Sequence, residues 1–190
     1  MNYKDILSYW YNNPLDYNKW FFKSSDYDNE IIKKFYKIHE QASEGHLLHW
    51  LNKKESYLAL IIILDQFSRH INRNNSKAFE NDDICILFTQ MGLHFLQEMT
   101  ANQIIFVMLP FQHSENIKDS DFQIKILNNF LKREQNVKEK NILKKSLYHA
   151  KKARKVLKTF NRYPKRNKHL KRENTEEEVD YLDENTEFHY

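Results

Sequence analysis

Two glycines and three prolines occur in 190 residues, and this scarcity constrains the fold more than any other feature of the sequence. A β-sandwich or a doubly wound α/β fold needs more glycines in its tight turns and phosphate-binding loops. No stretch shows the alternation of apolar and polar residues that is typical of a half-buried strand. We therefore expect an all-α protein whose helices are joined by short polar loops.

Apolar residues recur at helical spacing along most of the chain. The segment 55–67 is apolar almost throughout, so we expect it to form the central helix. Thr100 is expected to cap an apolar helix that Pro110 closes, and Thr175 with Glu178 forms a capping box before a last short helix. Further amphipathic helices are predicted at 5–11, 26–43, 119–131 and 137–160. Asn81 or Asp82 is expected to cap another helix, which carries apolar residues from Ile84 to Leu96.

The length suits one domain with room for a sizeable core. We predict a single compact helical domain over residues 1–172, built from seven or eight helices packed in antiparallel pairs. The acidic segment 173–190 is expected to complete this domain with its short helix. The sequence leaves the oligomeric state open.

Cys85 is the only cysteine, which excludes an intramolecular disulfide and a cysteine-based zinc cage. His46 and His49 lie three residues apart, but the stronger spacings of metal motifs are absent. The longest apolar run, 57–64, is far shorter than the ~20 residues of a membrane span. No signal peptide is visible. We expect a cytoplasmic protein that has no membrane segment, no metal site and no cofactor.

Charge is distributed unevenly along the chain. Residues 138–172 contain fifteen Lys or Arg and one acidic residue, whereas residues 173–190 contain eight acidic residues and no Lys or Arg. Such a basic helix attracts nucleic acid without sequence preference, or an acidic protein, and its binding depends on salt. The alternative is a solvated helix face that the acidic tail partly neutralises. The predicted basic surface consists of Lys144, Lys151, Lys152 and Lys155.

Three short stretches, 65–73, 109–116 and 160–167, concentrate polar residues after predicted helices. A guanidinium fits a carboxylate or phosphate bidentately, so we interpret the three stretches as one pocket for a small anionic ligand or an acidic segment of a partner. Alternatively, Asp65, Glu115 and Glu178 pair with the arginines and tie loops together. The predicted ligand-binding residues are Asp65, Gln66, Arg69, Arg73, Arg162, Arg166, Asn167 and Arg172.

An enzyme acting on a phosphorylated or carboxylated small molecule is the alternative function. His113 is the candidate general acid or base, because the unperturbed pKa of histidine is about 6.5, and Glu115 could assist it. Ser114 has no neighbouring glycine turn, so a hydrolase nucleophile elbow is not expected. A loop histidine that satisfies backbone groups is the other interpretation of His113.

The three stretches and their surroundings form one ordered set of residues: Trp20, Phe21, Leu58, Ala59, Leu60, Asp65, Gln66, Phe67, Arg69, Arg73, Ala78, Phe79, Leu109, Pro110, His113, Ser114, Glu115, Gln123, Phe160, Arg162, Pro164, Arg166, Asn167, Leu170, Arg172, Thr175 and Glu178. In this order and spacing, the set resembles the bacterial family called domain of unknown function 924, and the resemblance covers nearly the whole chain. It implies a compact helical fold related to TPR-like helix pairs, and it implies no activity.

The chain departs from the family pattern at informative positions. Asn161 and Lys171 stand where the family usually has glycine, and Ala153 stands where it tends to carry a histidine. If that histidine were catalytic in the family, this member would be weakened or inactive.

Overall fold

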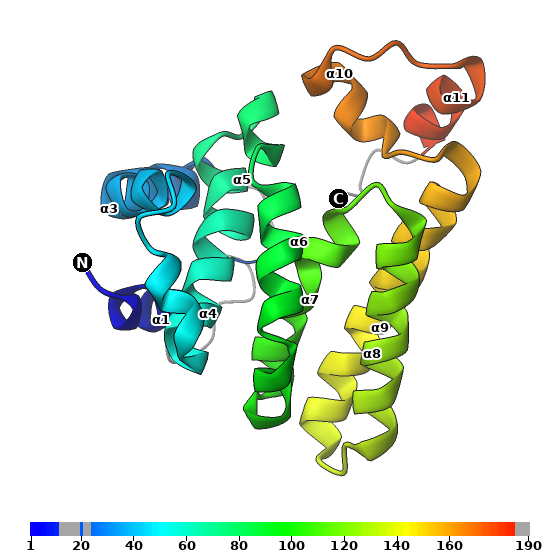
Figure 1. Cartoon of the computed structure of the whole chain (residues 1–190). Helices are drawn as coiled ribbons and strands as arrows, with labels where there is room; N and C mark the ends of the chain where they lie inside the picture. Colours follow the sequence, from blue (N-terminus) through cyan, green and yellow to red (C-terminus); the bar gives the residue numbers. More distant parts are fainter. Residues whose placement is uncertain (12–19, 21–23, 185–190) are drawn as a thin grey trace. The chain divides into compact units, whose positions relative to one another are not determined.

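The computed structural model describes residues 1–11, 20 and 24–184. All regular structure in these residues is helical, which confirms the all-α prediction (Figure 1). The chain divides into two compact units, residues 1–98 and 99–190. None of the described helices is both long enough and apolar enough to cross a membrane. The domain boundary at residue 172 and the TPR-like arrangement stay predictions.

The first unit is built around one buried helical segment. Helix α4 (Lys54–Ile61) runs into a π-helical turn, η2 (Ile62–Phe67), and then into α5 (Ser68–Ile71). Every residue from 56 to 68 is buried, which confirms the predicted central helix. A π-turn inserts an extra residue into the helical repeat and is frequent at functional sites.

Three helices cover this central segment. Helix α1 (Tyr3–Trp10) packs on α4, α3 (Ser25–Ser43) packs on η2 and α5, and α6 (Asp82–Met91) packs on α4 and η2. Two short 3₁₀ turns connect these elements, η1 (Leu48–Asn52) before α4 and η3 (Ser76–Phe79) before α6, and a third, η4 (Leu93–Glu98), follows α6.

The helix predicted to carry apolar residues as far as Leu96 is shorter in the structure, because α6 ends at Met91 and a 3₁₀ turn follows. Gly92 lies at the break and packs against the ring of Tyr57. A Cβ atom at Gly92 would lie only 2.2 Å from that ring. The glycine therefore allows a close approach between the end of α6 and the central helix.

The second unit contains three packed helices: α7 (Ala101–His113), α8 (Ile117–Arg133) and α9 (Val137–Phe160). Thr100 caps α7 as predicted. Pro110 does not end α7, which corrects the prediction. Proline removes the hydrogen bond to the carbonyl four residues earlier and its ring crowds that carbonyl, but the helix continues through a buried turn to His113.

Helix α9 has the predicted bounds and begins after the Asn136 cap. Its buried stripe includes Leu143, Leu147, Ala150 and Ala153, and lysines lie on the opposite face. Three short elements follow α9: η5 (Pro164–Arg166), α10 (Asn167–Leu170) and α11 (Glu176–Glu184) (Figure 1). The predicted capping box at the start of α11 is confirmed by the hydrogen bonds of Thr175 and Glu178.

Candidate functional site

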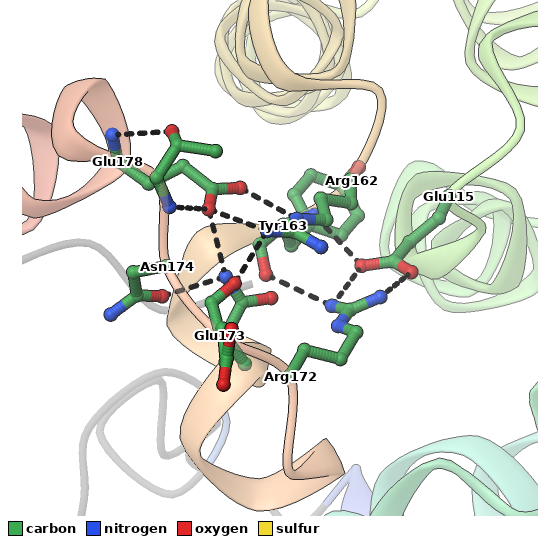
Figure 2. Close-up of polar contacts among 9 residues, drawn as sticks. Glu115, Arg162, Tyr163, Arg172, Glu173, Asn174 and Glu178 are labelled. Atoms are coloured by element: carbon green, nitrogen blue, oxygen red, sulfur yellow. Dashed lines mark hydrogen bonds and ion pairs between the residues drawn. The ribbon is translucent and has the colours of Figure 1, made fainter.

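The second and third polar stretches meet in the second unit (Figure 2). Arginines from the segment after α9 contact carboxylates from the α7–α8 loop and from α11. We call this group the clamp; it consists of Glu115, Arg162, Tyr163, Asn167, Arg172 and Glu178. The first polar stretch belongs to the other unit, so a single pocket that joins all three stretches stays a prediction.

Glu115 and Arg172 form a bidentate ion pair in the clamp. Nη1 of Arg172 donates to Oε2 of Glu115 at 2.7 Å, and Nη2 donates to Oε1 at 2.9 Å. The backbone N–H of Tyr163 donates to the same carboxylate at 2.7 Å. Burial acts to raise the pKa of Glu115, but these hydrogen bonds outweigh it and hold the pKa below its ordinary value. Glu115 is therefore ionised and engaged near neutral pH.

Glu178 and Arg162 form the second bidentate pair. Nε and Nη2 of Arg162 each donate to one carboxylate oxygen of Glu178 at 2.6 Å. Glu178 also accepts from the Thr175 backbone N–H at 2.9 Å and from Nδ2 of Asn167 at 3.2 Å. The Arg162 hydrogen bond, followed by the Thr175 bond, lowers the pKa of Glu178 to about 2 although burial acts against it. Glu178 is thus an ionised carboxylate with only 2% of its surface exposed.

Two left-handed residues bring the clamp together. Asn161 (φ 55°) ends α9 and Lys171 (φ 55°) ends α10. The first turn reverses the chain after α9, and the second precedes Arg172, which reaches Glu115. The hydroxyl of Tyr163 donates to the backbone carbonyl of Gln112 at 2.5 Å, so the segment after α9 is attached to the end of α7.

The predicted catalytic loop contributes backbone and hydroxyl contacts. His113 is the last residue of α7 and is buried; its carbonyl accepts from Nη2 of Arg166 at 2.8 Å. The Ser114 hydroxyl donates to Asp119 at 2.6 Å and accepts from the Asn116 N–H. Arg166 is itself buried, and its guanidinium lies 5.2 Å from the ring centroid of Tyr163. These contacts position the loop, and a catalytic role for His113 and Glu115 stays a prediction.

In the first unit, the polar residues of the π-turn form a separate buried group. The side chain of Gln66 donates to Asp65 at 2.5 Å, and Asp65 lies 3.4 Å from the Arg69 guanidinium. Arg69 also donates to Asp82 at 2.9 Å and to the carbonyl of Ala78 at 2.8 Å. The Arg69 guanidinium is therefore shared between two carboxylates: Asp65 on the central segment and Asp82 at the start of α6.

Arg73, the last residue of the first stretch, pairs with Asp28 in the first turn of α3. The ring of His70 also contacts Asp28, at 2.8 Å. Burial acts to raise the pKa of Asp28, but the hydrogen bonds from Arg73 and His70 outweigh it and lower the pKa. The sequence interpretation missed the pairing of Asp28 and Asp82 with these arginines, because each carboxylate is distant in sequence from its partner.

The predicted basic surface lies on α9. We call it the lysine face; it consists of Lys144, Tyr148, Lys151, Lys152, Lys155 and Lys158. In the part of the chain that the structure describes, Lys144, Lys151, Lys155 and Lys158 are exposed and form no ion pair. The Nζ atom of Lys152 lies 4.8 Å from the ring centroid of Tyr148.

Ala153 lies on the opposite side of α9 and is fully buried beside Val156, Leu157 and Tyr163. The described residues contain no group of three or more His, Cys, Asp or Glu side chains that could hold a metal ion. The clamp and the π-turn group are networks of ion pairs and hydrogen bonds. They hold arginines against protein carboxylates, which is the alternative that the sequence left open for Asp65, Glu115 and Glu178.

The fold matches a known structure over nearly its full length. The solved structure of a protein of unknown function from Agrobacterium tumefaciens is 29% identical, with a TM-score of 0.83, and the match covers 96% of this chain and 97% of that chain. Comparison with curated proteins gives no match. A family model described as bacterial protein of unknown function (DUF924) matches residues 6–186. The chain therefore belongs to the DUF924 family, as its polar motifs indicated.

Proposed function

We propose that this protein binds polyanions, and that the lysine face contacts the phosphate backbone of nucleic acid. One observation carries the proposal: four exposed lysines share one side of α9 and have no carboxylate partner in the described residues. Lys144, Lys151, Lys155 and Lys158 are three, four or seven residues apart, so they follow one line along the helix. Like charges at this spacing repel one another, and phosphates would relieve the repulsion.

The acidic segment does not neutralise this face within the described residues. The exposed carboxylates of α11 form no ion pair with the lysine face, and the buried Glu178 pairs with Arg162. The pKa of His149, which neighbours the lysine face, is lowered by partial burial and then by Lys152 and Lys145. The two lysines lower this pKa because their positive charges disfavour the protonated imidazole, which indicates a positive potential along α9.

The arginine groups support a small-anion function less well. Arg69, Arg73, Arg162 and Arg172 each hold a protein carboxylate, so a small anion would have to displace that carboxylate. Removing one partner from such a buried pair is costly. We expect phosphate, sugar phosphates and dicarboxylates to leave the unfolding midpoint unchanged in a thermal-shift assay. If one of these anions did bind, at 100 times its Kd it would stabilise the fold by about 2.7 kcal/mol. Such a stabilisation would favour a small-anion site at the arginines over the lysine face.

The test of the proposal is fluorescence anisotropy with a labelled oligonucleotide over a range of salt concentrations. The variant Lys151→Glu/Lys155→Glu is expected to lower the affinity by about tenfold or more, and to make its salt dependence less steep. The matched control is Lys33→Glu/Lys37→Glu, which makes the same change of net charge on the exposed side of α3.

Equal losses in the two variants would show that net charge alone drives binding and would overturn the proposal. The absence of any binding by the unaltered protein at low salt would also overturn it. If an acidic protein were the partner instead, an acidic polypeptide such as polyglutamate would bind more tightly than the oligonucleotide.

A further inference from the structure

Tyr148 is an exposed aromatic residue in the middle of the lysine face. It follows Lys144 by four residues and precedes Lys151 by three, so the three side chains lie on the same side of α9. The residue keeps 55% of its surface exposed. Its ring meets Nζ of Lys152 at 4.8 Å and the ring of His149 at 5.4 Å. The ammonium group of Lys152 and the ring of His149 thus lie beside the aromatic ring, and more than half of the surface of Tyr148 is open to solvent.

We propose that the lysine face prefers single-stranded to double-stranded nucleic acid, with Tyr148 stacking on an unpaired base. This inference rests on the polyanion-binding function proposed above. Single strands expose base faces, and a base that stacks on an aromatic side chain adds affinity without sequence preference. A duplex hides its base faces and has the higher charge density, so lysines alone would give no preference for single strands.

The spacing of the lysines suits a single strand that has one base stacked on Tyr148. The face from Lys144 to Lys158 is about 21 Å long at the rise of an α-helix, which accommodates a short run of nucleotides. Along the helix axis, Lys144 precedes Tyr148, and Lys151, Lys155 and Lys158 follow it. Phosphates before and after the stacked base can therefore each meet a lysine.

The experiment compares labelled oligothymidine with a duplex of the same length, by anisotropy, for the full chain and three variants. The unaltered protein is expected to bind the single strand more tightly. Tyr148→Ala is expected to lower single-strand affinity about tenfold and to leave duplex affinity unchanged, whereas Tyr148→Phe keeps both affinities. The matched control is Tyr36→Ala, because Tyr36 on α3 is 49% exposed and follows Lys33 by one helical turn, outside the lysine face.

Three results would overturn the inference: tighter binding of the duplex by the unaltered protein, an equal loss on both nucleic acids in Tyr148→Ala, or no loss in that variant. The polyanion-binding proposal survives each of them if Lys151→Glu/Lys155→Glu still loses binding relative to its control. Because Tyr148 is exposed, its replacement is expected to leave the circular dichroism spectrum and the unfolding midpoint unchanged.

Discussion

The arginines of the clamp and the lysines of α9 carry the same charge, but their surroundings are opposite. Arg162 and Arg172 each meet one carboxylate through two hydrogen bonds. Lys151 and Lys155 point into solvent and meet no carboxylate in the described residues. The planar guanidinium suits fixed bidentate pairs, whereas the ammonium on its flexible stem remains hydrated. The basic segment 138–172 therefore combines a region in which charge organises the fold with a region in which charge is available to a partner.

The contrast predicts that the clamp serves stability and that the lysine face serves binding. Changes in the clamp should mainly alter the free energy of unfolding, and changes on the lysine face should mainly alter the affinity for polyanions. The predictions that follow test the contrast in order of decreasing effect on stability.

The largest effect is expected from Glu178→Ala. The carboxylate accepts two bonds from Arg162, one from Thr175 and one from Asn167 while almost fully buried. Its removal takes the acceptor from the half-buried Arg162 guanidinium and from the buried Asn167 amide, and we expect a loss of about 1–3 kcal/mol in urea-induced unfolding. Glu177→Ala is the control, because the neighbouring side chain is exposed. A loss below 1 kcal/mol for Glu178→Ala would mean that the clamp does not hold the fold.

The contribution of Glu178 to stability should depend on pH. Its pKa is about 2 in the folded chain, against an ordinary value of 4.5. A carboxyl whose folded pKa is depressed stabilises the fold fully above its unfolded pKa, and the stabilisation disappears as pH falls through the folded pKa. Unfolding of the unaltered protein and of Glu178→Gln should therefore differ by a constant amount above pH 5 and converge as pH approaches 2. A gap that stays constant down to pH 2 would contradict the ionised pair.

A smaller effect, of opposite sign, is expected at the turn before Arg172. Lys171 adopts a left-handed backbone conformation, which costs an L-residue about 1–2 kcal/mol and costs glycine almost nothing. Lys171→Gly is expected to stabilise the protein by up to about 1 kcal/mol in thermal unfolding, and Asn161→Gly by less, because asparagine tolerates this conformation. Destabilisation by Lys171→Gly would show that the lysine side chain, rather than the turn, holds Arg172 in place.

Local patterns predicted the parts of the molecule that depend on neighbours in sequence. Helix α9 has its predicted bounds, because its apolar stripe repeats over many turns, and the Thr175–Glu178 box is a contact over three residues. The predicted end of α7 was wrong, because burial of the following turn outweighs the cost of placing Pro110 inside the helix. The π-turn at 62–67 has no signature in an apolar run.

The candidate site was predicted in its members but not in its pairings. The residue types in the three stretches indicated arginines that need negative partners, and two carboxylates within or after those stretches, Glu115 and Glu178, supply them. Asp28 and Asp82 complete the pairs of Arg73 and Arg69 across long sequence separations. Such pairings depend on how helices pack, and a single sequence does not contain that information.

The smallest effect on stability is expected from Lys151→Gln/Lys155→Gln, and this variant tests the contrast most sharply. The two lysines lie one turn apart and repel each other, so their neutralisation should change the free energy of unfolding by no more than about 0.5 kcal/mol, toward stabilisation. The same variant should bind oligothymidine less tightly and with a smaller salt slope, because fewer counterions are released. Urea unfolding and anisotropy on one preparation measure both quantities. If the variant lost stability without losing affinity, the lysine face would belong with the clamp as a structural element, because only lysines that contribute to the fold can destabilise it when they are neutralised.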